Sequence, residues 1–280
     1  MFVDNSIKAV QPYLQQKLGE IYSTREIQIF SEMILEALFD LSKTDLILNN
    51  RKFSESELLQ IRAVSKRLIE HEPIQHILGF AHFYGHDFKV NRDVLIPRPE
   101  TEELLALVLK DHTDGKLLDI GTGSGCIPIT LKLENNAFEV SALDVSSKAI
   151  AIAQENALRF NLEVNFIHSD ILQDELEDKY DIIISNPPYV LESDKKEMQE
   201  SVLSFEPGLA LFVPDDKALM FYERISDLAF TSLNDGGQLY FEIHEAFGEE
   251  TVQLLNNKGF NNIKLIQDLQ GKDRIVTAQK

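Results

Sequence analysis

The chain has 280 residues, of which 44% are hydrophobic and 26% charged, with a formal net charge of −19 and a single cysteine, Cys126. This composition predicts one large or two modest globular domains in the cytoplasm, because one cysteine excludes an internal disulfide framework and no segment resembles a signal peptide or reaches the ~20 apolar residues of a membrane span. Residues after position 75 hold 35 of the acidic and 18 of the basic side chains. This part of the chain would therefore repel DNA or RNA unless a local basic patch overcame the repulsion. The alternative, weighted equally, is that the acidity only keeps the protein soluble.

Residues 1–75 are predicted to form a helical domain that recognises a substrate. One helix follows a cap at Ser23 with Glu26 nearby, and a second begins at Ser54. The apolar residues of the first recur at helical spacing, and those of the second are expected on one side: Ile27, Phe30, Met33, Ile34, Ala37, Leu38 and Leu41, and then Leu58, Leu59, Ile61, Val64, Leu68 and Ile69. Nothing in this segment looks catalytic, which favours a binding role.

Residues 76–98 are predicted to be a linker with a β-hairpin. The stretch AHFYGHDFKV alternates in polarity, with Gly85 at the turn, and prolines then precede a helix expected over residues 100–110. His82 and His86 have a metal-like spacing. In a hairpin, however, a separation of four residues does not bring side chains together as it does on a helix, so no metal site is expected.

Residues 99–280 are predicted to form an α/β domain. Strands alternate with helical stretches as far as GGQLYFEIH, which implies a doubly wound, mostly parallel sheet covered on both faces. The last two strands, NIKLIQDL and RIVTAQ, are expected to pair as an antiparallel hairpin at one edge. Ligands of such sheets bind at the carboxyl ends of strands where the strand order reverses, and this places DIGTGSG and SNPPY at one cleft.

The segment LLDIGTGSGC connects a predicted strand to a helix. Gly121, Gly123 and Gly125 allow a tight turn and close approach of a ligand to the backbone. Asp144 ends the next strand, 19 residues after Gly125, where a carboxylate can accept both hydroxyls of a ribose. Together these features favour an adenosyl ligand. A structural turn without a ligand and an NAD site are the alternatives.

Asp170 and Ile171 follow the third strand and are expected on the same cleft. Asp170 could accept a hydrogen from the adenine amino group, and Ile171 could press on the face of the ring. A carboxylate at this position is as often a helix cap, and that alternative is weighted equally.

The segment DIIISNPPY ends a buried strand in an unusual way. Two consecutive prolines stiffen the backbone and remove two N–H donors, so Asn186 and Pro187 present acceptors: a side-chain oxygen and a carbonyl. Two fixed acceptors suit an NH2 group with two hydrogens to donate. Tyr189 adds a flat ring against which an amide or base could lie. The alternative is an edge strand stopped by prolines.

An adenosyl cofactor facing an NH2 clamp implies methyl transfer from S-adenosylmethionine, with S-adenosylhomocysteine as the product. Hydrogen bonds from both hydrogens of an amide to fixed acceptors would raise the electron density on its nitrogen. The methylated, N-protonated amide is a strong acid, so no dedicated base is required, and none is present in SNPPY.

These residues resemble the class I S-adenosylmethionine-dependent methyltransferases, whose fold is a seven-stranded, Rossmann-like sheet with an antiparallel seventh strand, over about residues 95–280. The wider pattern is similar to one branch, the release factor glutamine methyltransferases (HemK/PrmC family), over essentially the whole chain. It comprises a helical N-terminal domain, EPIQHILG, IPRPETE, SNPPY, FEPGLAL, GGQLYFEI and GKDRIV. Members of this family methylate the glutamine amide of the Gly-Gly-Gln motif in class I peptide-chain release factors.

The resemblance implies roles for particular residues. The cofactor would be held by the loop, the strand-end acid, Ile171 and Asn186, that is, by Gly121, Thr122, Gly123, Ser124, Gly125, Asp144, Ile171 and Asn186. The glutamine amide would be bound by Asn186, Pro187, Pro188 and Tyr189, of which Asn186, Pro187 and Tyr189 would act in catalysis. Two departures stand out: Ile171 replaces the larger aromatic of many members, and HEAF, with His244, replaces a glycine and a later glutamine.

Three functions remain in competition. The first is a protein glutamine methyltransferase, expected to be a monomer that acts on release factors without binding nucleic acid directly. The second is an amino-group methyltransferase of adenine or guanine in DNA or RNA, which would share the NH2 clamp. The third is a non-catalytic cofactor-binding protein that regulates a partner through its helical domain.

Overall fold

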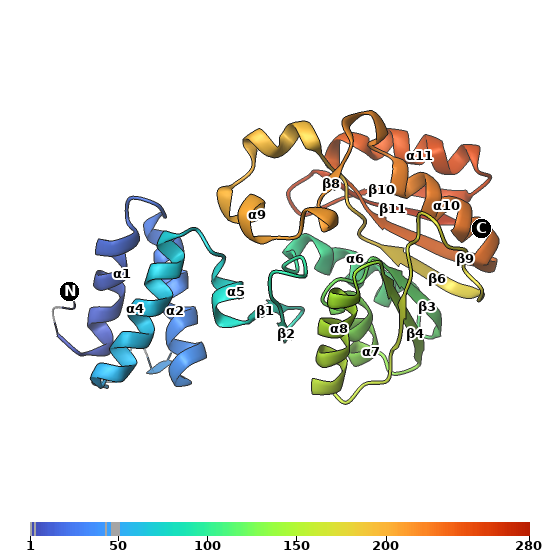
Figure 1. Cartoon of the computed structure of the whole chain (residues 1–280). Helices are drawn as coiled ribbons and strands as arrows, with labels where there is room; N and C mark the ends of the chain where they lie inside the picture. The colour runs from blue at the N-terminus through green and yellow to red at the C-terminus, as the bar shows by residue number, and fades with distance from the viewer. Residues whose placement is uncertain (1, 3, 43, 46–50) are drawn as a thin grey trace. The chain divides into compact units, whose positions relative to one another are not determined.

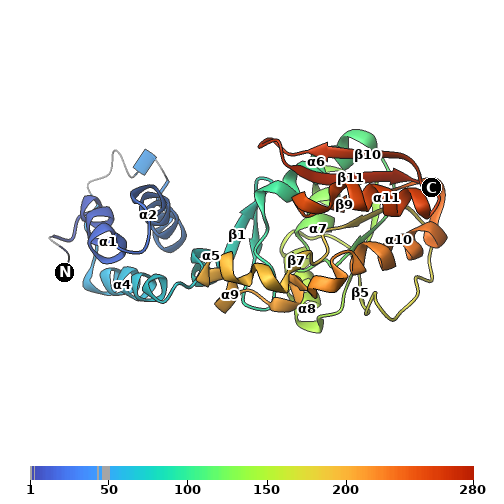
Figure 2. The ribbon, with the colours of Figure 1, turned by 90° about the horizontal axis from the view of Figure 1, so that it is seen from above.

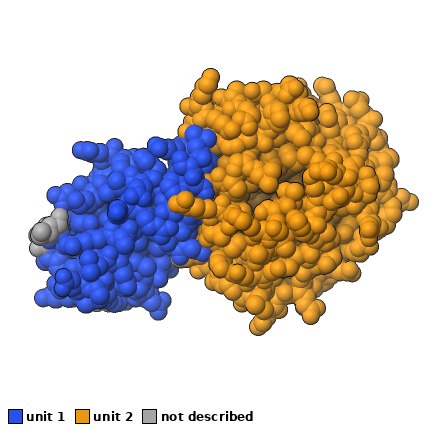
Figure 3. Space-filling view, in the orientation of Figure 1, with its two compact units in different colours: residues 1–79, 199–205 blue, residues 80–198, 206–280 orange. Residues whose placement is uncertain are grey.

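The structure is a computed structural model that describes residue 2 and residues 4–42, 44–45 and 51–280. It divides into two compact units (Figure 3). Unit 1 comprises residues 1–79 together with 199–205, and unit 2 comprises residues 80–198 and 206–280. The predicted linker region thus divides between the units, and a short segment from late in the chain joins unit 1.

Unit 1 is helical (Figure 1). Its elements are a 3-10 helix (Ile7–Ala9), α1 (Val10–Leu18), α2 (Thr24–Phe39), α4 (Glu55–Ile69), α5 (Ile74–Leu78) and α9 (Glu200–Phe205). Ser23 and Ser54 cap α2 and α4 through complete capping boxes with Glu26 and Glu57, as the serine caps predicted.

One prediction for α4 was wrong. Leu59 and Ile69 are 53% and 41% exposed, whereas Ile61, Val64 and Leu68 are buried. The buried positions are spaced three and four residues apart and form one stripe, and Leu59 and Ile69 fall off that stripe because the helix turns about 100° per residue.

Unit 2 begins with the predicted hairpin, formed by β1 (Phe80–Phe83) and β2 (His86–Lys89). Phe83 pairs with His86 across a two-residue turn in which Tyr84 and Gly85 both have positive φ. A turn of this kind matches the twist of the strands, and glycine adopts it without strain. His86 reaches Glu134 on a neighbouring helix at 3.4 Å, while His82 reaches Asp87 at 3.1 Å, so the two imidazoles have different partners.

The main sheet of unit 2 has seven strands in the order β10-β11-β9-β6-β3-β4-β5. These are β3 (Gly115–Ile120), β4 (Phe138–Asp144), β5 (Asn165–His168), β6 (Tyr180–Ser185), β9 (Leu233–Glu242), β10 (Asn261–Gln267) and β11 (Asp273–Gln279). β11 is antiparallel to both of its neighbours, and the other pairs are parallel. The predicted α/β fold with an antiparallel edge hairpin is confirmed. A short parallel pair, β7 (Val190–Leu191) and β8 (Phe212–Val213), was not predicted.

Helices cover both faces of the sheet (Figures 1 and 2). They are α6 (Pro99–Asp111), α7 (Cys126–Glu134) and α8 (Ser147–Arg159) on one face, and α10 (Met220–Ser232) and α11 (Gly248–Asn257) on the other. The three isoleucines of β6 divide between the two cores: Ile182 and Ile184 pack with residues of α6 and α7, and Ile183 packs with residues of α10. A strand buried on both faces needs apolar side chains at consecutive positions.

The strand order reverses at β3. From β3 the chain passes to β4 and β5 on one side, and it then returns to place β6 on the other side. In open α/β sheets ligands bind where the strand order reverses, which places a ligand site beyond the carboxyl ends of β3, β4 and β6. Among the described residues, no helix has both the length and the apolar character needed to span a membrane.

Candidate active site

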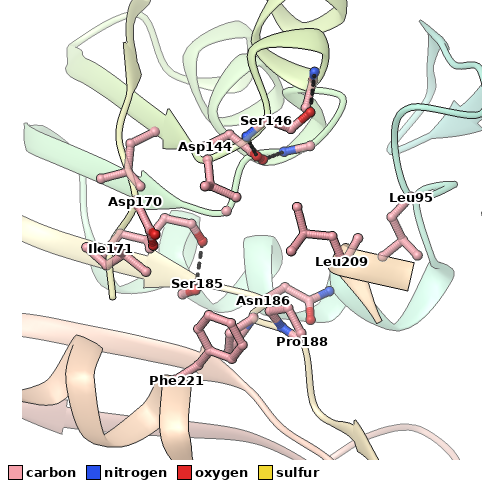
Figure 4. Close-up of a pocket in the computed structure, with 18 of the residues that line it drawn as sticks. Leu95, Asp144, Ser146, Asp170, Ile171, Ser185, Asn186, Pro188, Leu209 and Phe221 are labelled. Carbon is pink, nitrogen blue, oxygen red and sulfur yellow. Dashed lines mark hydrogen bonds between the residues drawn. The ribbon is translucent and has the colours of Figure 1, made fainter. Parts of the chain in front are cut away.

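A cavity of about 220 Å³ lies at this reversal point. One part of its wall comes from the residues that end four adjacent parallel strands: Gly121 after β3, Asp144 at the end of β4, Ile171 after β5 and Asn186 after β6. Figure 4 shows Asp144, Ile171 and Asn186 around one central space. The predicted meeting of the glycine loop with SNPPY at one cleft therefore holds in this structure.

The glycine loop contributes backbone to the cavity wall. Gly121 and Gly123 line the cavity at φ +80° and +55°, and a Cβ built on either would meet no protein atom within 4 Å. A side chain at either position would therefore occupy space open to a ligand. Thr122 and Ser124 are buried and do not line the cavity.

Gly125 has a different role from the other two glycines. A Cβ there would lie 3.0 Å from the Ala153 Cβ and 3.0 Å from the Ile129 Cδ1, so its absence lets the loop pack closely against α8. The loop is also held by the fully buried Asn156 of α8, whose Nδ2 donates to the Ser124 carbonyl at 2.9 Å and to the Lys89 carbonyl at 3.0 Å. No sequence motif pointed to Asn156.

Asp144 is held in place by the backbone around it. The Gly123 N–H donates to Oδ2 and the Ser146 N–H donates to Oδ1, each at 2.8 Å. Burial raises the pKa of Asp144, and these two N–H groups oppose the rise. A carboxylate has about four lone-pair sites, so the fixed Asp144 side chain can still accept a hydrogen bond from a diol in the cavity.

Replacing Asp144 with Ala should weaken binding of S-adenosylhomocysteine about ten- to a hundredfold, if the lost contacts contribute ~1.5–3 kcal/mol. Calorimetry measures the dissociation constant directly. Asp144→Asn is the matched control for shape: it should retain part of the affinity, because one amide oxygen still accepts. A change below about twofold for the alanine variant would show that the ribose is held elsewhere.

Ile171 and Asp170 both line the cavity, as expected for strand-end residues. Ile171 is 7% exposed and also belongs to the core under α10, so it offers an edge of apolar surface. The Asp170 carboxylate accepts the Leu172 N–H at 3.0 Å and the Gln173 Nε2–H at 2.6 Å. It therefore caps the following turn, and an adenine contact would have to share its oxygens.

Asn186, Pro187 and Pro188 line the cavity. Asn186 and Pro188 lie opposite Asp144 (Figure 4). Tyr189 stands outside the wall. Its hydroxyl donates to Glu242 Oε1 at 3.2 Å, and its ring lies edge-on to His244, 5.9 Å between ring centroids. His244, the departure noted in the sequence, caps a short 3-10 turn by accepting the Ala246 N–H on Nδ1 at 3.1 Å.

Two acidic residues near the cavity were missed by the sequence analysis. Glu242, at the end of β9, is 1% exposed; burial raises its pKa, while Thr101, Arg274 and Tyr189 oppose the rise. Glu206 accepts from Arg98 at 2.6 Å and from the Ile96 N–H at 3.1 Å, which ties the segment before α6 to the segment after α9. A single carboxylate inside an apolar run, as in QLYFEI, is the sequence signal that could have identified such a buried acidic residue.

Asp119 is a third such acid, under the glycine loop. It is fully buried, and neither oxygen makes a hydrogen bond of normal geometry with any residue that the structure describes. Burial raises the pKa of Asp119 to about 7, a rise that the nearby Thr122 hydroxyl moderates. The hydroxyls of Thr122 and Ser124 likewise make no hydrogen bond of normal geometry among the described residues.

The cavity fits S-adenosylmethionine by the chemistry of its walls. The glycines leave room beside the backbone, Asp144 presents fixed acceptors for a diol, and Ile171 with Phe221 presents apolar surface for a base. The residues present therefore suit an adenosyl ligand.

Fold and cavity together define a class I methyltransferase. A methyltransferase of known structure from Pyrococcus furiosus has a similar fold, with a TM-score of 0.54 and 19% identity over 77% of this chain and 96% of its own. Two family models also match, the PrmC N-terminal domain over residues 13–79 and the methyltransferase small domain over residues 100–204.

The chain belongs to the release factor glutamine methyltransferase family. The relative of that name from Flavobacterium psychrophilum is 45% identical over 278 residues, covering 96% of this chain and 98% of the relative. The relative from Bacteroides thetaiotaomicron is 42% identical over 280 residues, covering 97% and 99%. The resemblance read from the sequence motifs is thereby confirmed, and the protein is an enzyme of the methyltransferase class.

Proposed function

We propose that this enzyme transfers a methyl group from S-adenosylmethionine to the side-chain amide nitrogen of the glutamine in the Gly-Gly-Gln motif of peptide-chain release factors. The observation that carries the proposal is that Asn186 and Pro187, the acceptor pair, line the same cavity as Asp144. Membership of a family whose relatives bear this name supports the choice of substrate.

The cofactor, when bound, supplies a methyl group on a sulfonium, which is already a good leaving group. Gly121 and Gly123 would admit it beside the loop backbone, Asp144 would accept from its ribose, and Ile171 would pack against its adenine. Thr122, Ser124 and Gly125, which do not line the cavity, would hold the loop in its conformation. The positions of Gly121, Gly123, Asp144 and Ile171 on the cavity wall support these assignments.

The protein's part in the chemistry is to align and activate the amide nitrogen. Asn186 Oδ1 and the Pro187 carbonyl would each accept one amide hydrogen, which holds the nitrogen and raises its electron density. Pro188 keeps the Pro187 carbonyl in place by restricting the backbone before it. The proton that leaves the methylated nitrogen can pass to water, because an N-protonated amide is a very strong acid.

The proposal is tested by incubating the enzyme and labelled S-adenosylmethionine with purified release factor, a Gly-Gly-Gln peptide, DNA and RNA in separate reactions. We expect label in the release factor and the peptide, and loss of that label when the glutamine is replaced by glutamate. Labelling of DNA or RNA alone would instead assign the clamp to a base amino group.

The helical residues of unit 1 are proposed to recognise the release factor. A chain that begins at residue 73 should keep binding S-adenosylhomocysteine, because unit 2 contains the whole cavity. Its kcat/KM should fall much more with intact release factor than with a Gly-Gly-Gln peptide, and comparing the two substrates in one variant corrects for any loss of folded enzyme. Equal losses on both substrates would contradict a recognition role.

A further inference from the structure

A chain of hydrogen bonds links Asn186 to two buried residues that do not line the cavity. Asn186 Nδ2 donates to Thr101 Oγ1 at 3.3 Å, and the Thr101 hydroxyl donates to Glu242 Oε2 at 2.7 Å. The other oxygen of Glu242 accepts from the Tyr189 hydroxyl at 3.2 Å. Thr101 and Glu242 are 3% and 1% exposed, and neither lines the cavity. One carboxylate thus connects to two residues of the SNPPY segment.

The direction of these hydrogen bonds determines how the Asn186 amide is turned. A hydroxyl has one hydrogen, and Thr101 donates it to Glu242 Oε2. Thr101 Oγ1 must then accept, and only the NH2 end of Asn186 can donate to it. The Oδ1 end is left available to a ligand. Without this chain, two amide orientations of almost the same shape would compete.

The position of Glu242 is itself well determined. The residue ends β9, and its backbone carbonyl accepts from the Tyr222 hydroxyl of α10 at 3.2 Å. Thr101 stands in the first turn of α6, which packs on the opposite face of the sheet. The hydrogen-bond chain therefore joins elements on both faces to the end of β6.

We propose that Thr101 and Glu242 are positioning residues, which hold Asn186 so that its Oδ1 meets the NH2 group of the substrate. The inference rests on the proposed function in one respect, the assignment of Asn186 Oδ1 as a substrate acceptor. Thr101 and Glu242 touch neither substrate nor cofactor in this arrangement and act only through Asn186 and Tyr189.

The first test compares Thr101→Val, which removes the hydroxyl at almost constant shape, with Thr101→Ser, which keeps it. Thr101→Val should lower kcat about ten- to a hundredfold, since misplacing a reacting group by ~1 Å can cost about a hundredfold. KM, the melting temperature and the affinity for S-adenosylhomocysteine should stay near wild type, and Thr101→Ser should recover most of kcat. A serine variant as slow as the valine variant, or a valine variant as fast as wild type, would overturn the proposal.

A double-mutant cycle separates positioning from an independent effect. If Thr101 acts through Asn186, adding Thr101→Val to Asn186→Ala should cause almost no further loss of kcat. Losses that multiply would overturn the proposal. The Glu242→Gln variant should be at least as slow as the Thr101→Val variant, because it disturbs the hydrogen bonds from both the Thr101 and the Tyr189 hydroxyl. Wild-type turnover in folded Glu242→Gln protein would overturn the role proposed for the Glu242 carboxylate.

The positioning role of Thr101 and Glu242 can be tested separately from the identity of the substrate. If the proposed substrate is wrong, the wild type would leave release factor unlabelled, and the same cycle would be run on whichever DNA or RNA amino group it methylates. A measurement independent of turnover is the NMR signal of the Asn186 side-chain NH2. Thr101→Val should shift this signal, and Thr101→Ser should preserve it; an identical spectrum in all three proteins would contradict the hydrogen-bond chain.

Discussion

Replacing Asn186 with Ala should lower kcat on a Gly-Gly-Gln peptide by about two to three orders of magnitude, comparable to the loss of one oxyanion-hole donor in other enzymes. The lost oxygen would accept more strongly as charge develops on the amide nitrogen, so its removal affects the transition state more than substrate binding. Affinity for S-adenosylhomocysteine should change much less. Steady-state kinetics and calorimetry on the same preparation measure both quantities.

The matched control is Asn165→Ala, at the amino end of β5, where the side chain donates to Ser141 Oγ at 3.3 Å outside the cavity. Turnover of this control should be near wild type. Asn186→Asp is the more informative second variant: it keeps an acceptor for the substrate but replaces the donor that faces Thr101, whose hydrogen is already used by Glu242. We expect it to be severely impaired. Near-normal turnover of Asn186→Ala would mean that SNPPY is only a rigid strand end.

Replacing Gly123 with Val should weaken binding of S-adenosylhomocysteine at least about a hundredfold, or ~2.7 kcal/mol. The backbone of Gly123 has φ +55°, a region that β-branched residues strongly avoid, and the new side chain would enter open space on the cavity wall. The change would also disturb the N–H that holds Asp144 Oδ2 at 2.8 Å. Backbone strain, the side chain on the cavity wall and the disturbed hydrogen bond to Asp144 should therefore all weaken binding of the cofactor.

Gly271→Val is the control for backbone strain. Gly271 has φ +80° with no protein atom within 4 Å of an added Cβ, and it lies in the turn between β10 and β11, away from the cavity wall. Both variants should lose some thermal stability, but only Gly123→Val should lose cofactor affinity. Unchanged affinity in folded Gly123→Val protein would remove the loop from the binding site.

Local rules in the sequence were enough to predict the elements and the place where they meet. Alternating strands and helices predicted the parallel sheet, and the reversal rule placed DIGTGSG and SNPPY at one cleft, because every parallel strand presents its carboxyl end at the same edge. Capping boxes at Ser23 and Ser54 set the helix starts, since the partners of each cap lie three residues apart in the chain. The family motifs were likewise readable, because each is contiguous.

Only the tertiary structure decided the features that depend on residues distant in the sequence. Which loop residues face the cavity depends on packing against α8: Gly123 lines the wall, whereas Gly125 packs against Ala153. Leu59 was misplaced because its neighbour Leu58, which is partly buried, is the leucine that packs against the core of unit 1.

The partners of Asn186 lie even further away in the sequence. Thr101 and Glu242 are separated by 141 residues and meet at 2.7 Å only because α6 packs across the end of β9. The sequence by itself determined the fold, the family and the acceptor pair, since these depend on short contiguous patterns. The orientation of that pair depends on a buried hydrogen-bond chain, and the direction of each bond follows only once the three side chains are in contact.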